Sequence, residues 1–319
     1  MFTSVLKLWK QLPVPFQERI SLTLKPTGIP YFLSYMAKYK RAHQLSHFAG
    51  NLLLVKEEYL RGAGDRKKLL SDQFDLVIDS LIMKNGVGKT TYSMRQNSIL
   101  SRVLSEKGCR IEKDEIIVLD VPSSIGTASL VIYEMLSKYY AISSYVLGDL
   151  YFNIYYDNAR ECIYDEEGNL LQVKLRKQFF SIYRPHTSGD VYNLGAYCLL
   201  LPLNLMSWYL KRKYIWADCN SYNPIVLVHP EVEEKLRDGV FSIRKIDVFK
   251  NIEEKFDVII SFNLLQKNYF PKRLIQMGIE NLKNALNEDG LLIMGNTESF
   301  SVSKKSKGRL QLIEKKGEF

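Results

Sequence analysis

The chain has 319 residues, of which 46% are hydrophobic and 25% are charged, a composition that excludes a disordered or fibrous protein and allows a substantial core. Its net charge of +9 favours an acidic partner such as phosphate, nucleic acid or an anionic membrane, but the basic residues are spread along the chain and give no strong nucleic-acid signal. Four dispersed cysteines without a CxxC pair, and a start that lacks the pattern of a secretory signal, lead us to expect a reducing, cytoplasmic location.

The first part of the chain, residues 1–83, is predicted to form a helical N-terminal region. Apolar and basic residues recur there at helical spacing, most clearly in the segment YFLSYMAKYKRAHQLSHFAGNLLLVKEEYL, and no strongly alternating strand interrupts them. Gly62 and Gly64 are expected to stop a helix.

The stretch KNGVGKTTYSMR, residues 84–95, resembles a triphosphate-binding loop in its Gly-Lys-Thr. Such a loop needs a glycine five residues earlier, where this chain has Met83, and it should follow a buried strand. The preceding FDLVIDSLIM is read equally well as a helix. A triphosphate site is therefore disfavoured.

From residue 84 to 319 the pattern changes to alternating strands and helices, which predicts an α/β, Rossmann-like parallel sheet with helices on both faces. The N-terminal helical region precedes this domain. The expected strands are 115–120, 144–149, 224–229, 241–247, 256–263 and 291–296, and the expected helices are 127–140, 230–239 and 271–290.

An insertion is expected within this domain at about 150–224. It contains a predicted hairpin that turns at Glu167-Gly168-Asn169, followed by an apolar run, Leu194–Leu210, that ends at the basic triplet 211–213. The run is short for a spanning helix, and Pro202 interrupts it. Three readings stay open: a buried helix, an oligomer contact, or an interfacial segment that places 194–213 on an anionic membrane, on its inner face.

Polar residues stand at the ends of four predicted strands, where an open parallel sheet binds its ligands. They are Asp120, Asp149, Asp247 and Asn263. A carboxylate after the second strand can accept both hydroxyls of a ribose, and one after the third can accept the amino group of an adenine. Each alone is equally explained as a helix cap.

The turn after the first strand, DVPSSIGTAS, contains Ser123 and a single glycine, Gly126. A dinucleotide pyrophosphate needs a more glycine-rich turn, whereas S-adenosylmethionine carries no phosphate and needs less. The turn therefore favours a methyltransferase over a nicotinamide-dependent dehydrogenase.

The segment FDVIISFNLLQKNYFPKRLIQMGIENLKNALNEDGLLIMGNTES resembles the C-terminal half of the bacterial chemotaxis-receptor glutamate methyltransferases, which are class I S-adenosylmethionine enzymes. DVPSSIGTASLVIYEML and VLGDL are similar to that family's turn, helix and second strand end, and KTTYSMR lies where the family has Asn-Glu-Thr-x-Phe-Phe-Arg.

This resemblance implies a cofactor site, with S-adenosyl-L-methionine as cofactor. Thr91 and Arg95 would contact its carboxylate end, Asp149 its ribose, Asp247 and Val248 its adenine, and Asn263 with Leu264 would line the reaction side. Asp120, Ser123 and Gly126 complete the expected cofactor-binding set, and no metal is expected.

The chain departs from the family where Lys89 replaces Asn, Thr127 replaces a cofactor-facing Glu, and Phe262 replaces Arg. These changes leave a second hypothesis open, in which a catalytically degenerate protein of this fold binds a nucleoside ligand or a partner protein. In the leading hypothesis a methyl group passes to a carboxylate, hydroxyl or amine of an unknown acceptor, either a protein or a membrane-associated molecule. Asn263 is the predicted catalytic residue, since a strand-end amide can position a nucleophile.

Overall fold

The computed structural model describes residues 49–79, 81, 83, 89, 111–175, 178–182, 194–217, 222–266, 270–296 and 299–317. The chain divides into two compact units, one formed by residues 1–89 and 153–225 and the other by residues 90–152 and 226–319. The sequence placed the insertion in the second domain, whereas this division groups it with the N-terminal residues.

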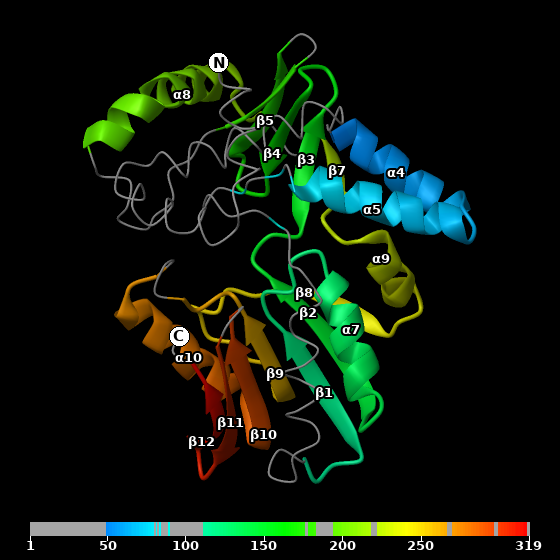
Figure 1. The fold of residues 1–319 in the computed structure, drawn as a ribbon, viewed down its shortest axis with the longest axis vertical. Helices are drawn as coiled ribbons and strands as arrows, with labels where there is room; N and C mark the ends of the chain where they lie inside the picture. Colours follow the sequence, from blue (N-terminus) through cyan, green and yellow to red (C-terminus); the bar gives the residue numbers. More distant parts are fainter. Residues whose placement is uncertain are drawn as a thin grey trace, which may run out of the picture. The chain divides into compact units, whose positions relative to one another are not determined.

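The second unit is built on a seven-stranded sheet (Figure 1) with the order β12-β11-β10-β9-β1-β2-β8. Five neighbouring strands, from β10 to β8, are parallel, and β11 and β12 are antiparallel additions at one edge. The strands are β1 (Glu115–Asp120), β2 (Ala141–Asp149), β8 (Phe241–Lys245), β9 (Phe256–Phe262), β10 (Leu286–Gly295), β11 (Phe300–Ser306) and β12 (Arg309–Lys316). The sheet is the predicted α/β, Rossmann-like arrangement, and five of its strands coincide with or overlap the strands expected from the sequence.

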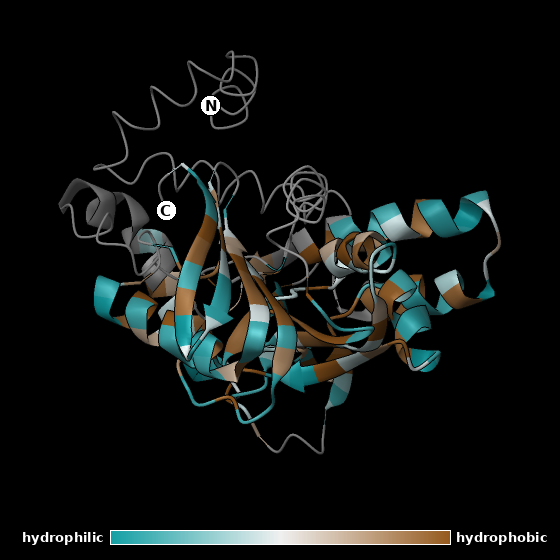
Figure 2. Ribbon diagram, turned by 90° about the horizontal axis from the view of Figure 1, so that it is seen from below, coloured by the Kyte–Doolittle hydropathy of each residue, from teal (hydrophilic) through white to brown (hydrophobic). Residues whose placement is uncertain are grey.

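Helices cover both faces of this sheet because alternate side chains of each buried strand point to opposite sides. On one face α7 (Thr127–Leu136) and α9 (Pro230–Arg237) pack on side chains that include Val118, Leu147 and Ile260. On the other face α10 (Lys272–Ala285) packs on their strand neighbours, such as Leu119 and Ile259. In Figure 2 the strands carry long brown, hydrophobic segments, and the helices at the sides carry more teal.

Two expectations for this region were wrong. The expected parallel strand at 224–229 is β7 (Asn223–Val226), which belongs to a separate sheet. The helix expected at 271–290 ends at Ala285, because the chain enters β10 at Leu286.

The first unit contains a five-stranded sheet with the order β6-β5-β4-β3-β7. The strands that precede β7 are β3 (Asn153–Asp157), β4 (Cys162–Asp165), β5 (Leu170–Leu175) and β6 (Gln178–Ser181). The predicted hairpin turn at residues 167–169 is confirmed, since β4 and β5 are antiparallel on either side of it. Trp216 covers this turn so closely that a Cβ on Gly168 would lie 2.7 Å from its ring.

Two helices precede this sheet in the same unit, α4 (Ala49–Arg61) and α5 (Asp65–Asp79). They confirm the helical prediction for 49–79, with Gly62 and Gly64 between them as expected; the part of the prediction on 1–48 lies outside the described residues. The Lys56 ammonium lies 5.5 Å from the centre of the Phe74 ring, which links the two helices. The described residues 74–79, which precede KNGVGKTT, are helical and not a strand, which is a further argument against a triphosphate loop.

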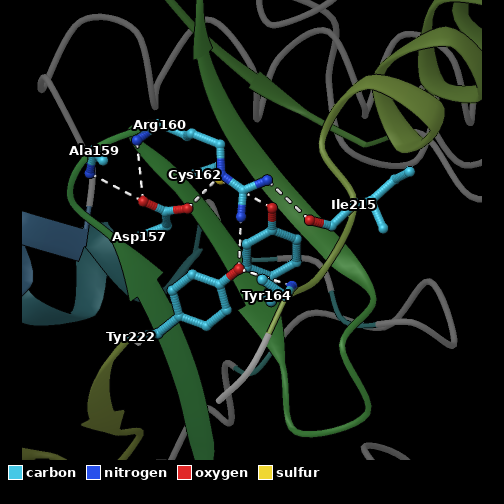
Figure 3. A network of polar contacts seen from close by, with 8 residues as sticks. Asp157, Ala159, Arg160, Cys162, Tyr164, Ile215 and Tyr222 are labelled. Carbon is cyan, nitrogen blue, oxygen red and sulfur yellow. Dashed lines mark hydrogen bonds and ion pairs between the residues drawn. The ribbon is translucent and has the colours of Figure 1, made fainter. Parts of the chain in front are cut away.

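A polar network fixes the segment after α8 (Leu194–Lys213) to the five-stranded sheet (Figure 3). Arg160 donates from Nε to Asp157 (2.5 Å), from Nη1 to the carbonyl of Ile215 (2.9 Å) and from Nη2 to the Tyr222 hydroxyl (2.5 Å). The same hydroxyl accepts a hydrogen bond from the Ala217 N–H at 2.9 Å. These bonds join the β3–β4 turn to residues 215–222.

Candidate functional site

The carboxyl ends of β8, β2, β1 and β9 lie side by side, because these four parallel strands are neighbours in the sheet. Asp149 and Asp120 are the last residues of β2 and β1, Asn263 directly follows β9, and Asp247 comes two residues after β8. The four predicted strand-end residues therefore share one edge of one sheet, which we call the carboxyl edge.

Backbone hydrogen bonds tie these strand ends to one another. The carbonyl of Asp149 accepts from the Ile246 N–H at 2.9 Å, which joins the end of β2 to the segment that carries Asp247. The carbonyl of Ile260 in β9 accepts from the Val121 N–H at 2.9 Å, which joins β9 to the residue after Asp120.

The β1–α7 turn is held against the end of β2 by its backbone. The Ser123 N–H donates to the carbonyl of Gly148 (2.8 Å), and the Ser124 N–H donates to Oδ2 of Asp149 (2.9 Å). Oδ1 of Asp149 accepts from the Tyr151 N–H at 3.2 Å. Through its carboxylate, Asp149 therefore fixes both the β1–α7 turn and the segment that follows β2.

Gly126 ends this turn and caps α7 with a backbone φ of 85°, a left-handed conformation that favours glycine. A Cβ at this position would lie 3.0 Å from Cγ1 of Val232 in α9. Gly126 is thus needed for both its conformation and the close approach of α9, and it brings the start of α7 to the carboxyl edge.

The carboxyl group of Asp120 faces inward. Its Oδ2 accepts hydrogen bonds from Oγ of Ser129 (2.6 Å) and from the hydroxyl of Tyr145 (3.4 Å), and the residue is only 5% exposed. Burial raises the pKa of Asp120 to about 7, against the opposing effect of those two hydrogen bonds. Ser129 and Tyr145 were not foreseen, because nothing in the sequence pattern distinguishes them from ordinary helix and strand residues.

Two buried hydroxyls near this edge, Ser123 Oγ and Ser261 Oγ, have no hydrogen-bond partner among the described residues. Ser123 lies in the β1–α7 turn, and Ser261 follows Ile260, whose carbonyl binds that turn. An unpaired buried hydroxyl costs about 1–3 kcal/mol, so native structures rarely keep one without a ligand or water to bind it. The carboxyl edge therefore has unused hydrogen-bonding capacity, which fits a polar ligand.

The outer ends of the edge supply an amide and a second carboxylate. Asn263 is exposed in the left-handed conformation (φ 60°), its N–H donates to the Gly295 carbonyl (2.8 Å), and its Oδ1 accepts from Gln266 (3.3 Å). At the other end, Oδ1 of Asp247 accepts from the Phe249 N–H at 3.0 Å. Val248 is buried in the core and Leu264 packs partly buried against it.

The remaining predicted residues, Thr91 and Arg95, lie outside the described part of the chain. His229 is buried as the N-cap of α9, where its Nδ1 accepts from the Glu231 N–H at 3.3 Å. That geometry assigns it a structural role.

No protein-family model matches the chain, and no curated protein is significantly similar to it. Among solved structures it is similar to a proposed S-adenosylmethionine-dependent methyltransferase of Methanococcus maripaludis, with 12% identity over 72% of this chain and a TM-score of 0.31. That match spans 63% of the archaeal chain, less than two thirds of its length.

Two further structures show comparable similarity. An N-methyltransferase of Bradyrhizobium japonicum in complex with S-adenosylhomocysteine is 11% identical over 63% of this chain and 72% of its own, with a TM-score of 0.24. An S-adenosylmethionine-dependent methyltransferase of Clostridium acetobutylicum is 11% identical over 70% of this chain and 73% of its own, with a TM-score of 0.30. The likeness is distant, and what the site can do follows from the chain's own residues.

Proposed function

We propose that the protein is an S-adenosylmethionine-dependent methyltransferase whose cofactor binds at the carboxyl edge. The observation that supports this most is the set of hydrogen bonds that gathers the ends of β8, β2, β1 and β9 around one turn, with unpaired hydroxyls beside it. A nucleoside ligand without phosphates suits a turn that has one glycine and no lysine.

Each residue at this edge has a distinct task in the proposal. Asp149 accepts the ribose hydroxyls from its place at the end of β2, as the resemblance to the chemotaxis-receptor enzymes implies. Ser123 donates its unpaired hydroxyl to the ligand. Asp247 and Val248 hold the adenine, as the resemblance to the chemotaxis-receptor enzymes implies.

Asp120 acts through its neighbours in this proposal. Its carboxyl binds Ser129 in α7 and Tyr145 in β2, so it fixes the helix start and the strand that frame the turn. This replaces the direct cofactor contact expected from the sequence with a positioning role.

S-adenosylmethionine supplies a methyl group bonded to a positively charged sulfur, which a nucleophile displaces in line. The protein's part is to hold that nucleophile close and aligned, an effect worth about 7–11 kcal/mol of the barrier. Asn263 is placed for this task, because its exposed amide follows β9 at the open edge. Thr91 and Arg95 stay predicted ligands of the carboxylate end.

A second candidate is a protein of the same fold that binds a nucleoside ligand without catalysis. Thr127, where the resembling family has a cofactor-facing glutamate, favours this candidate. The two proposals share the binding site and differ only in turnover.

A calorimetric titration with S-adenosylhomocysteine, followed by incubation with methyl-labelled S-adenosylmethionine and a cell extract, separates these outcomes. Saturable binding and labelled product are expected. Binding without label transfer would support the second candidate. Failure to bind S-adenosylhomocysteine, together with binding of NAD, would overturn both and favour a nicotinamide-dependent enzyme.

A further inference from the structure

The C-terminal half of α8 exposes large apolar side chains on one side. Leu205, Met206, Trp208 and Tyr209 are between 42% and 57% exposed, whereas Ser207 and Leu210 are at most 2% exposed. At 100° per residue, the four exposed side chains and Pro202 occupy one arc of the helix, and Ser207 and Leu210 lie opposite. This exposed arc is too apolar for an ordinary solvated helix face.

Arg212 and Lys213 continue the same arc at the end of the helix, and Lys211 lies beside it. Lys211, Arg212 and Lys213 are all exposed, and the Arg212 guanidinium lies 4.1 Å from the centre of the Trp208 ring. The sequence from 191 to 217 contains no Asp or Glu. The arc therefore combines apolar and aromatic side chains with a cationic end, and no acidic residue on the helix neutralises it.

The opposite side of the helix is anchored in the five-stranded sheet's core. Leu210 belongs to a buried cluster with Tyr164 and Tyr222. Beyond the helix end, the Trp216 ring lies 5.0 Å from that of Tyr164, and Arg160 holds the Ile215 carbonyl (Figure 3). Because these contacts fix the buried side, the arc faces away from the core of its unit.

The side chains of the arc fit the surface of an anionic bilayer better than a second copy of the chain. Amphipathic helices that lie on bilayers place Trp, Leu and Met at the boundary between headgroups and acyl chains and direct Lys and Arg to anionic headgroups. None of the described helices is long and apolar enough to cross a bilayer. A second copy of the chain would bring a second basic triplet to the interface, which like-charge repulsion opposes.

We propose that α8 docks this arc onto an anionic membrane surface, with Leu205, Met206, Trp208 and Tyr209 in the interface and the basic triplet on acidic headgroups. The contact is independent of the proposed methyl transfer, since it uses none of the residues at the carboxyl edge. It would hold the protein at a membrane whether or not the cofactor is bound.

Co-sedimentation of the full chain with vesicles of phosphatidylglycerol and phosphatidylcholine tests the proposal. We expect binding to the mixed vesicles and little to pure phosphatidylcholine. Replacing Lys211, Arg212 and Lys213 with Gln should weaken binding roughly a hundredfold, because each basic residue near an anionic surface contributes about fivefold. A triple Gln substitution at Arg309, Lys315 and Lys316, which are exposed on β12, removes the same charge and should change binding little.

A second measurement tests the apolar half of the contact. The tryptophan emission of the parent protein should shift to shorter wavelength on anionic vesicles, and Trp208→Phe should lose most of that shift although Trp9 and Trp216 remain. Three results would overturn the proposal: no binding to anionic vesicles, equal loss of binding in the β12 variant, or sedimentation-velocity dimers that Leu205→Glu dissociates and vesicles do not affect. The last result would assign the arc to a second copy of the chain.

Discussion

Asp257 and Asp120 lie near opposite edges of the same seven-stranded sheet and are surrounded very differently. Asp257, near the start of β9, accepts hydrogen bonds from Lys113 Nζ (2.6 Å), the Ile117 N–H (3.0 Å) and Asn287 (2.8 Å). Although burial alone would raise the pKa of Asp257, these donors lower it below its usual value. Asp120, at the end of β1, has two hydroxyl donors and no cationic partner among the described residues, and burial raises its pKa to about 7.

The two carboxylates lie at opposite edges of the sheet: Asp257 at the edge where the parallel strands begin, which we call the amino edge, and Asp120 at the carboxyl edge. At the amino edge, the buried carboxylate of Asp257 is hydrogen-bonded to groups of β1 and β10, so it links β9 to both strands. At the carboxyl edge, an acid with a raised pKa lies near two unpaired hydroxyls, Ser123 and Ser261. Perturbed acids and unused donors gather where a ligand is bound, which is why the second edge is the candidate site.

The largest effect on stability is expected from Asp257→Ala. The substitution leaves the buried Ile117 N–H and the Asn287 amide without their acceptor, so the free energy of unfolding should fall by about 2–4 kcal/mol in chemical denaturation. Since the folded pKa of Asp257 is lowered, its stabilisation is present above about pH 4 and should be lost as the pH falls through the folded pKa. The affinity for S-adenosylhomocysteine should not change. A weakened affinity would show that the amino edge also contributes to the ligand site.

Asp120→Asn should have the opposite pH dependence. The folded pKa of Asp120 is raised, so its favourable contribution is complete below about pH 4 and is lost as the pH rises through about 7. The amide cannot ionise, so above pH 7 the variant should gain about 1–3 kcal/mol relative to the parent in unfolding free energy. Urea denaturation from pH 5 to 8 measures this, and a difference that does not vary with pH would disprove the raised pKa.

Asp149→Ala should weaken binding of S-adenosylhomocysteine by more than tenfold, or about 1.4 kcal/mol, because two ribose hydroxyls lose their acceptor. It should also destabilise the free protein, since the N–H groups of Ser124 and Tyr151 lose their partner. Asp257→Ala is the matched control, destabilised but with normal affinity. Equal affinities of the parent and the Asp149→Ala variant for S-adenosylhomocysteine would show that the end of β2 does not bind the ligand.

Ser123→Ala gives the smallest and most diagnostic effect. Removing a buried hydroxyl that has no partner among the described residues should leave the free energy of unfolding unchanged or slightly higher. The same change should weaken binding of S-adenosylhomocysteine by about threefold to tenfold, since one hydrogen bond to the ligand is lost. Reduced stability with unaltered affinity would instead assign the hydroxyl a structural partner.

Much of the sheet could be predicted because its strands carry their own signals. EIIVLD is an uninterrupted apolar run that ends in a carboxylate, and the structure has β1 over the same residues, 115–120. PIVLVH carries a similar signal, yet β7 lies in the other sheet, since a short apolar run does not encode its pairing partner. The end of α10 was missed because residues 287–290 were taken to complete the helix. They lie within β10 (Leu286–Gly295), where the pairing with β9 is irregular between Leu286 and Leu291.

The strand-end residues of the site were predictable because parallel neighbouring strands end at the same edge of a sheet. Asp149 and Asp247 lie near one another because β2 and β8 are such neighbours. The inward orientation of Asp120 was not predictable, because it depends on Ser129 and Tyr145, which lie 9 and 25 residues away along the chain. The unpaired hydroxyls of Ser123 and Ser261 could be recognised only from burial.

Hydrogen–deuterium exchange with and without S-adenosylhomocysteine tests the central claim most directly, because it compares the two edges in one experiment. We predict slower exchange at residues 121–127, 149–152 and 246–249, and no change at 113–117 and 286–290. Protection at the amino edge instead, or at neither edge under saturating ligand, would contradict the assignment of the site.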